Sequence, residues 1–279
     1  HIDRVITLED LERTGENIAP IELATIGAGA IIHVFPHRSV ARWAKAAGIP
    51  RRIGTGHRWW HWLTCNERVS FSRKRSDLHE AQLNIKLLGP LGIPVPASIE
   101  ELVPHIGYRP PAVSPRVRGL LRTGVKNVVL HPLLGSGVGW GLENFAALIE
   151  ALDPERYHCL ITGTEVEAAR YRSELPITAA HVTDTGGSLD LSGLMELIGA
   201  CDAFVSASTG PLHLAAASGV RSIGLFSMRR PIFPARWAPI GRDAHALVFD
   251  PLCARCAAGR RCDCIQRISP QRVFDLLER

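Results

Sequence analysis

Two hydrophobic patterns alternate along the chain: short apolar runs, and longer stretches in which apolar residues recur with a helical period. The second half shows this most clearly. Its apolar runs predict buried strands at 127–130, 158–162, 203–207 and 222–226. Helical patterns separate these runs, and the Ser269-Pro270 start signal predicts a last helix over Gln271–Leu277. Strands that alternate with helices predict an α/β fold, with a parallel sheet covered on both faces.

The first half repeats the alternation on a smaller scale, with strands predicted at 4–8, 28–35 and 52–54 and helices at 39–47 and 76–88. Regular elements are then interrupted by six prolines: Pro94, Pro96, Pro104, Pro110, Pro111 and Pro115. The sequence therefore predicts an N-terminal lobe over 1–100, a proline-rich linker over 101–123 and a C-terminal lobe over 124–279.

Composition bounds the class of protein. A chain of 279 residues can bury two cores, and 46% hydrophobic with 21% charged residues is an ordinary globular composition. The longest mostly apolar stretch, Leu23–Phe35, is too short to cross a bilayer, and the first residues do not form a signal peptide. We therefore expect a cytoplasmic protein. The net charge of +5 fits an anionic partner without choosing among a glycolipid, a nucleotide and nucleic acid.

The most informative stretch is Ser206–Gly219, which reads S-A-S-T-G-P-L-H-L-A-A-A-S-G. A strand ends here and a helix begins at Ser208-Thr209-Gly210-Pro211. Serine or threonine caps a helix, and proline suits its first turn. A helix N-terminus at the carboxyl end of a buried strand presents free N–H groups to an anion. The pattern predicts a phosphate site, although a plain capped helix would show the same spacing.

Several segments together resemble glycosyltransferase family 9, the heptosyltransferase-like enzymes. The helix motif matches the family's nucleotide-sugar signature, and R-R-P-I-F-P-A-R-W-A-P-I-G matches the loop that follows it. Further matching blocks occur in the family's order at 47–54, 76–84, 140–145 and 161–167. The resemblance implies a GT-B architecture of two Rossmann-like lobes, with the acceptor held by the first and the sugar nucleotide by the second.

The resemblance also implies a donor site made from Ser208, Thr209, Gly210, His213, Glu167, Trp140 and Arg230. The helix start would hold the diphosphate, and Glu167 would accept hydrogen bonds from ribose hydroxyls. Trp140 would belong to a phosphate-contacting loop after the glycine-rich run 135–139, and Arg229 and Arg236 would join Arg230. The alternatives are a packing role for His213, a solvated helix position for Glu167 and surface positions for the arginines.

The chain departs from the family in three places. The family's G-D motif, whose aspartate is the presumed general base, is expected upstream of His1, so the first lobe is expected to be incomplete at its N-terminus. Val138 and Gly139 stand where a lysine is expected, and Ser208 replaces the usual aspartate. The implied chemistry is an inverting displacement at the anomeric carbon. Protein groups would stabilise the leaving diphosphate, so no cofactor is required for the reaction.

Candidate acceptor residues lie in the first lobe, where the resemblance implies an anionic glycolipid. Arg38 follows a predicted strand, Arg58 lies in the run H-R-W-W-H-W, and Arg73 begins the run R-K-R. Tryptophan can stack on sugars and arginine can pair with acidic groups, which also suits a membrane surface. We expect a lipopolysaccharide-type acceptor at the inner face of the membrane and no nucleic acid. Packing tryptophans beside a solvated charge run is the structural alternative.

Four of the seven cysteines form C-x2-C-x5-C-x-C: Cys253, Cys256, Cys262 and Cys264. Four thiolates at this spacing can bind a structural zinc or iron ion, while disulfides or free thiols are the alternatives.

Three functions remain open. The first is transfer of heptose or a related sugar from an ADP-heptose-like donor, and the second is sugar-nucleotide binding without catalysis. The third is nucleic-acid binding by a basic protein that a metal ion stabilises.

Overall fold

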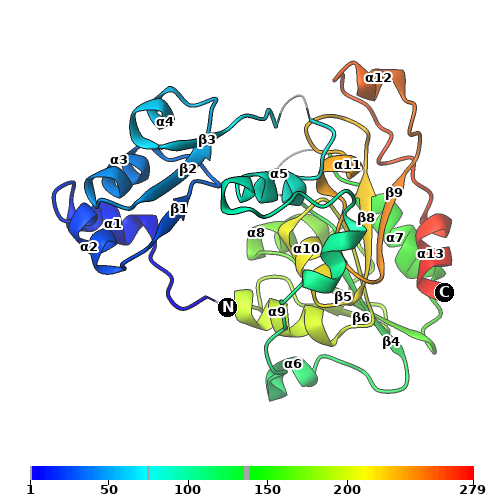
Figure 1. Ribbon diagram of the computed structural model, residues 1–279. Helices are drawn as coiled ribbons and strands as arrows, with labels where there is room; N and C mark the ends of the chain where they lie inside the picture. Colours follow the sequence, from blue (N-terminus) through cyan, green and yellow to red (C-terminus); the bar gives the residue numbers. More distant parts are fainter. Residues whose placement is uncertain (1, 74–75, 135–137) are drawn as a thin grey trace. The chain divides into compact units, whose positions relative to one another are not determined.

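The computed structural model describes residues 2–73, 76–134 and 138–279, and the chain forms two compact units, His1–Ala97 and Ser98–Arg279 (Figure 1). Within the described residues, no helix combines the length and the apolar character that a membrane span requires.

The second unit is built on a six-stranded parallel sheet with the spatial order β6-β5-β4-β7-β8-β9. Its strands are β4 (Lys126–His131), β5 (Tyr157–Ile161), β6 (Val182–Asp184), β7 (Ala203–Ala207), β8 (Arg221–Phe226) and β9 (Ala244–Val248). The chain adds strands outward from β4 to β6 and then, from β7, on the other side of β4. This is the Rossmann strand order, and its direction reverses between β4 and β7.

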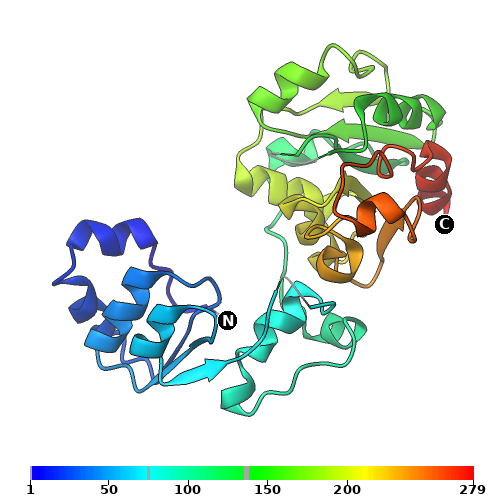
Figure 2. The same cartoon turned by 90° about the horizontal axis from the view of Figure 1, so that it is seen from above.

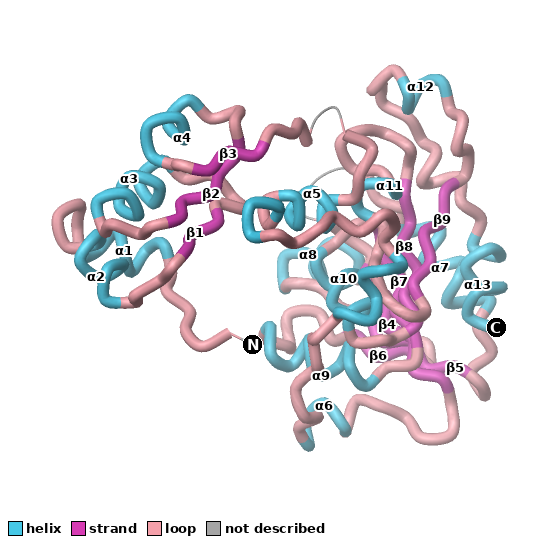
Figure 3. The backbone as a smooth tube through the Cα atoms, in the orientation of Figure 1, coloured by secondary structure: helices cyan, strands magenta, loops and turns pink. Residues whose placement is uncertain are grey.

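Helices cover both faces of this sheet, as the tube view shows (Figure 3). One core contains side chains of α7 (Leu142–Ala151), α8 (Glu165–Tyr171) and α13 (Pro270–Glu278), and α7 and α13 lie side by side (Figure 2). The other core contains side chains of α6 (Pro115–Arg118), α9 (Leu191–Ala200) and α10 (Gly210–Ala217). The predicted α/β fold with a doubly covered parallel sheet is confirmed for this unit.

The four strands predicted in the second half are present, whereas β6 and β9 were not predicted. β6 has only three residues and β9 is half-buried, so neither makes a distinct apolar run. Residues 101–123 fall inside the second unit rather than between two units. They include α6, whose Val117 is buried in the core, and most of the 3₁₀-helix η2 (Glu100–His105). Proline interrupts regular structure here without preventing packing.

The first unit contains a three-stranded parallel sheet in the order β1-β2-β3, made of β1 (Ala30–Ile32), β2 (Arg51–Thr55) and β3 (Glu67–Val69). Its helices are α1 (Leu8–Thr14), α2 (Ala19–Thr25), α3 (Arg38–Ala46), α4 (Trp59–Thr64), α5 (Glu80–Lys86) and the 3₁₀-helix η1 (Gly89–Leu91). The predicted helix at 39–47 and strand at 52–54 are confirmed as α3 and β2.

Two predictions in this unit were wrong in detail. Residues 4–8 do not form a strand, because Thr7 caps α1 by accepting the Asp10 N–H and the segment before it lies exposed except for Ile6, which packs against a core. The helix expected over 76–88 begins only at Glu80. There the His79 ring accepts the Ala81 N–H and the Gln82 side-chain oxygen accepts the His79 N–H, which completes a capping box.

Candidate functional site

The start of α10 lies at the carboxyl end of β7. The hydroxyl oxygen of Thr209 accepts the Leu212 N–H at 3.4 Å and lies 3.0 Å from the hydroxyl oxygen of Ser206, which is fully buried at the strand end. A Cβ added to Gly210 would meet no heavy atom of the described residues within 4 Å. Pro211 has no N–H and the Leu212 N–H is taken by Thr209, so the first turn of α10 presents the Gly210 N–H and the positive end of the helix dipole to an open space, where an anion would be stabilised.

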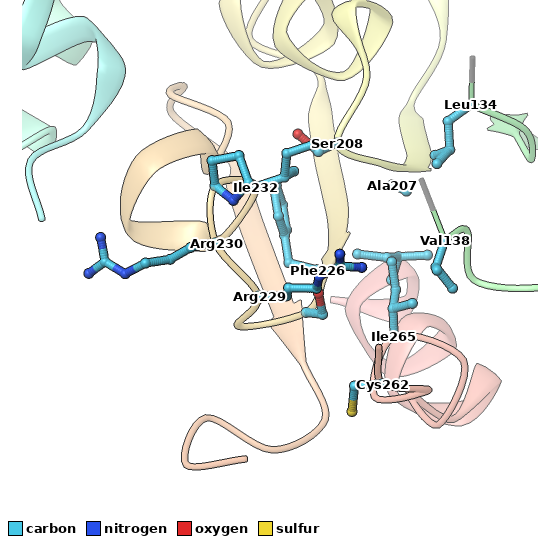
Figure 4. A pocket seen from close by; sticks show the side chains of 13 residues that line it. Leu134, Val138, Ala207, Ser208, Phe226, Arg229, Arg230, Ile232, Cys262 and Ile265 are labelled. Atoms are coloured by element: carbon cyan, nitrogen blue, oxygen red, sulfur yellow. The ribbon is translucent and has the colours of Figure 1, made fainter. Parts of the chain in front are cut away.

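One pocket opens beside this helix start, which we call the Arg229 pocket (Figure 4). It has a volume of about 220 Å³, and its lining includes Leu134, Ser208, Phe226, Arg229, Arg230 and Cys262. In Figure 4 the Arg230 side chain points away from the other labelled residues, and its guanidinium lies 4.6 Å from the centroid of the Phe233 ring. Arg229 and Ser208 bring a cation and a hydroxyl to a partly apolar pocket.

A second pocket, the Glu167 pocket, lies at the carboxyl ends of β4, β5 and β6 and has a volume of about 380 Å³. Its polar lining includes His131, Thr162, Glu167 and Asp190, and Leu189, Leu191 and Leu194 supply apolar side chains. Pro211 of α10 also lines it. The start of α10 thus contributes Ser208 to one pocket and Pro211 to the other, beside the reversal point of the sheet, where ligands of such sheets bind.

Glu167 is held in place by its own helix. Its Oε2 accepts the Thr164 N–H at 2.8 Å and lies 3.0 Å from the Thr164 hydroxyl oxygen, so the two residues form a capping box. This role was not foreseen, and it accompanies rather than replaces the position of Glu167 in the pocket lining.

His131 is a pocket residue that the sequence analysis missed. It ends β4, and its Nδ1 lies 3.0 Å from the Thr162 hydroxyl oxygen. Burial lowers the pKa of His131 and so favours a neutral ring, while the nearby charge of Glu167 raises that pKa by a smaller amount. A polar residue closing the apolar run V-V-L-H was the available signal.

Residues 139–262 match the model of "Glycosyltransferase family 9 (heptosyltransferase)", and this segment contains α10 and most of both pocket linings. Over these residues the chain is similar to glycosyltransferase family 9. It is 26% identical over 234 residues to the Haemophilus influenzae protein described as "Putative glycosyltransferase". That alignment covers 79% of this chain and 66% of the relative, just under two thirds of its length.

Solved structures of similar fold include two heptosyltransferases. The Escherichia coli ADP-heptose lipopolysaccharide heptosyltransferase II gives a TM-score of 0.69 at 19% identity, covering 96% of this chain and 80% of that one. An E. coli heptosyltransferase solved with ADP gives 0.62 at 14% identity, covering 98% and 78%. At these identities the likeness concerns the fold, which is that of GT-B heptosyltransferases.

The structure brings together five of the seven donor residues expected for family 9. Ser208 and Arg230 line the Arg229 pocket, Glu167 lines the other, and Thr209 and Gly210 lie at the helix start between them. His213 lines neither pocket. Its ring centroid lies 6.2 Å from that of Trp237 in α11 (Pro234–Trp237), so His213 makes an aromatic contact.

The expectation for Trp140 needs correction. Its indole is fully buried in the core, packs edge-on against Phe145 and donates from Nε1 to the Ile268 carbonyl at 2.7 Å. A side chain with no exposed surface cannot contact a ligand, so we remove it from the donor site. In the preceding glycine-rich run, 135–137 lies outside the described residues, and Val138 lines the Arg229 pocket.

On the acceptor side, the first unit has a groove between α3 and α4 with a volume of about 470 Å³. Its lining includes Arg38, Arg42, Lys45, Trp59 and Trp60, and the Arg38 guanidinium lies 4.9 Å from the centroid of the Trp59 ring. Arg58 does not line the groove, but its guanidinium lies 5.4 Å from the centroid of the Trp60 ring.

Arg73 lies apart from this groove. Its guanidinium donates to Glu80 at 2.6 Å and to the Asn84 side chain at 2.9 Å. These contacts attach the segment after β3 to α5. The structure therefore associates Arg38 and Arg58 with the tryptophan helix, while Arg73 has a separate structural contact.

The four clustered cysteines meet as their spacing predicted. Their sulfur atoms all lie within 4.8 Å of one another, with Cys262 Sγ 2.9 Å from Cys264 Sγ and 3.5 Å from Cys253 Sγ. Cys256, in α12 (Ala254–Ala257), and Cys264 are buried. This group could bind a metal ion. The remaining cysteines, Cys65, Cys159 and Cys201, are buried elsewhere, and burial raises the pKa of each thiol.

Proposed function

We propose that this protein transfers heptose or a related sugar, with inversion, from a nucleoside-diphosphate sugar to a lipopolysaccharide-type or other glycan acceptor. The observation that carries the proposal is the open N-terminus of α10, which contributes residues to two pockets at the reversal point of the sheet. Those pockets offer separate places for the two ends of a sugar nucleotide.

The nucleoside is assigned to the Glu167 pocket. Leu189, Leu191 and Leu194 would contact the base, and Glu167 would accept hydrogen bonds from the ribose hydroxyls. The solved heptosyltransferase with ADP and the ADP-heptose enzyme of similar fold support adenine as the base. ADP-heptose or a close analogue is therefore the proposed donor.

The diphosphate is assigned to the first turn of α10, at Thr209 and Gly210, with its distal phosphate and the sugar in the adjoining Arg229 pocket. At the helix start the Gly210 N–H and the helix dipole would bind the phosphate oxygens, and Arg229 and Arg230 would supply positive charge from the pocket. Ser208 would contact the same end of the donor.

In the transfer step, an acceptor oxygen attacks the anomeric carbon from the face opposite the diphosphate. The new glycosidic bond forms as the bond to the phosphate oxygen breaks, and the acceptor proton passes to a general base. Negative charge develops on the diphosphate, where α10 and the arginines stabilise it, so no cofactor takes part in the reaction.

The groove between α3 and α4 is the proposed acceptor site. Arg38 would pair with acidic groups and Trp59 would stack on a sugar, with Arg58 close by. Trp62 and Leu63 lie exposed on the same helix. Such a surface suits an anionic glycolipid at the cytoplasmic face of the membrane rather than nucleic acid.

We assign the four cysteines a structural role with zinc or iron, since four protein ligands leave no open position on a tetrahedral ion.

The competing proposal is a sugar-nucleotide-binding protein without catalysis. The absence of lysine at positions 138 and 139, where Val138 and Gly139 stand, favours it.

Incubation with ADP-heptose and a heptose-deficient lipopolysaccharide core distinguishes these proposals. Transfer predicts a mass gain of one heptose on the acceptor with release of one ADP. Tight ADP binding without transfer or ADP release would favour the non-catalytic protein.

A further inference from the structure

Cys262 belongs to two features of the second unit at once. Its sulfur is one of the four clustered sulfurs, and the residue also lines the Arg229 pocket (Figure 4). Ile265, three residues later, lines the same pocket. The segment that carries the cysteines therefore forms part of the pocket wall.

The positions of the sulfurs suit a single tetrahedral ion. Zinc–sulfur bonds of about 2.3 Å place the four sulfurs of a tetrahedral site roughly 3.8 Å apart. The observed separations of 2.9 Å and 3.5 Å, with all four sulfurs within 4.8 Å, need only small shifts to reach that arrangement. Thiolates are soft ligands that select zinc over magnesium or calcium.

Residues 252–263, which we call the cysteine segment, precede the buried Cys264 and Ile265 and bury little surface of their own. Cys256 is their only buried residue, and Leu252 is 89% exposed. The backbone N–H groups of residues 257–260 donate to carbonyls within the same segment. Since hydrophobic burial is almost absent, the sulfurs are the groups positioned to anchor the cysteine segment, and a metal bound by them would supply folding free energy directly.

We propose that Cys253, Cys256, Cys262 and Cys264 bind one Zn²⁺, and that this ion fixes the cysteine-segment wall of the Arg229 pocket, so that donor binding depends on the metal. The second half of this proposal rests on the proposed function, since it takes the pocket to be part of the donor site. Four thiolates around Zn²⁺ carry two negative charges. Arg255, Arg260 and Arg261 on the same segment, less the one negative charge of Asp263, supply two positive charges that balance them.

The metal site is tested first. Purified full-length protein is analysed for metal by mass spectrometry, and metal-free protein is titrated with Co²⁺ to detect thiolate absorption. We expect one zinc per chain, a tetrahedral cobalt spectrum, and loss of both in Cys256→Ser. Cys201→Ser is the matched control, because Cys201 is buried away from the cluster and donates to the Ile198 carbonyl at 3.2 Å. Iron, a disulfide or no metal in the wild-type protein would overturn the zinc site.

The link to the pocket is tested with ADP. Calorimetric titrations compare the zinc-loaded protein, the chelated protein and the chelated protein after zinc is restored. We expect ADP affinity to fall at least tenfold on chelation and to recover with zinc, with Cys201→Ser behaving as wild type. Circular dichroism checks that chelation leaves the core folded, so the test does not depend on Cys256→Ser folding.

The outcomes separate the two proposals. Equal ADP affinity with and without zinc would overturn the metal-dependent wall. A zinc-loaded protein that fails to bind ADP would overturn the proposed donor site, while its zinc content would still identify the metal site.

Discussion

The hydroxyl oxygens of Ser206 and Thr209 lie 3.0 Å apart, which joins a fully buried position at the end of β7 to the N-cap of α10. Ser206 also donates to the Ala207 carbonyl at 2.8 Å, so its hydroxyl is fixed on both sides. The helix start is thereby attached to the sheet at the place where the proposed diphosphate binds. A preorganised helix start binds an anion without first having to become ordered.

Replacing Thr209 by valine should damage this arrangement. The variant Thr209→Val loses the hydroxyl that accepts the Leu212 N–H, which costs about 1 kcal/mol of stability. We expect ADP affinity to fall about tenfold, equivalent to about 1.4 kcal/mol, and Thr209→Ser to restore most of it. Ser218→Ala at the other end of α10 is the control. Calorimetry and denaturant unfolding give the two readouts, and unchanged ADP affinity in Thr209→Val would contradict the assignment of the diphosphate.

Glu167→Gln should separate ribose binding from helix capping. Glutamine can complete the capping box with Thr164, so stability should change by less than about 1 kcal/mol. Losing a charged acceptor for the ribose should lower ADP affinity about tenfold, because such hydrogen bonds contribute about 1.5–3 kcal/mol. Affinity for 2′,3′-dideoxy-ADP should be the same in both proteins. The control is Glu165→Gln, in the same helical turn, where Glu165 pairs with Arg172. An equal loss for both nucleotides would argue against a ribose contact.

Trp140→Phe tests the corrected role of Trp140. Phenylalanine leaves the buried Ile268 carbonyl without the indole N–H, which should cost about 1–3 kcal/mol of unfolding free energy. ADP affinity, measured below the melting temperature, should stay within about twofold of wild type, because the Trp140 side chain lines neither pocket. A large loss of affinity with an intact fold would return Trp140 to the donor site.

Stability should fall on acidification, with His158 as one cause. Burial, with smaller influences from Arg122 and His181, lowers the pKa of His158 to about 4. The pKa of a histidine in an unfolded chain is about 6.5, so between pH 4 and 6.5 the unfolded chain binds more protons at this position than the folded one. The contribution of His158 to stability is therefore fully present above about pH 6.5 and is lost as the pH falls toward 4. Melting temperatures from pH 7.5 to 4.5 should show a shallower decline in His158→Gln, whereas parallel curves would exclude His158 as a cause.

The strands nearest the site could be predicted because they are buried on both faces. β4, β5, β7 and β8 carry continuous apolar runs, whereas the short β6 and the half-buried β9 do not. The α10 start was predictable for a related reason: its capping residues are local in sequence. Strand ends and local caps together account for the part of the site that a sequence can indicate.

Side-chain direction could not be predicted. Trp140 pairs with a carbonyl 128 residues away, and no local pattern shows that its indole enters the core. His131 follows three apolar residues at a strand end, and its position in the Glu167 pocket depends on where β5 and β6 end beside it. The cysteine spacing predicted that four sulfurs could meet, but not that Cys262 would also line a pocket.

We propose that the start of α10 and its two pockets bind a nucleoside diphosphate. The most direct test is calorimetric titration of the full chain with ADP, UDP and GDP under the same conditions. We predict micromolar binding of ADP with a stoichiometry of one and at least tenfold weaker binding of UDP and GDP. Failure of all three nucleotides to bind the folded, zinc-loaded protein would contradict the claim.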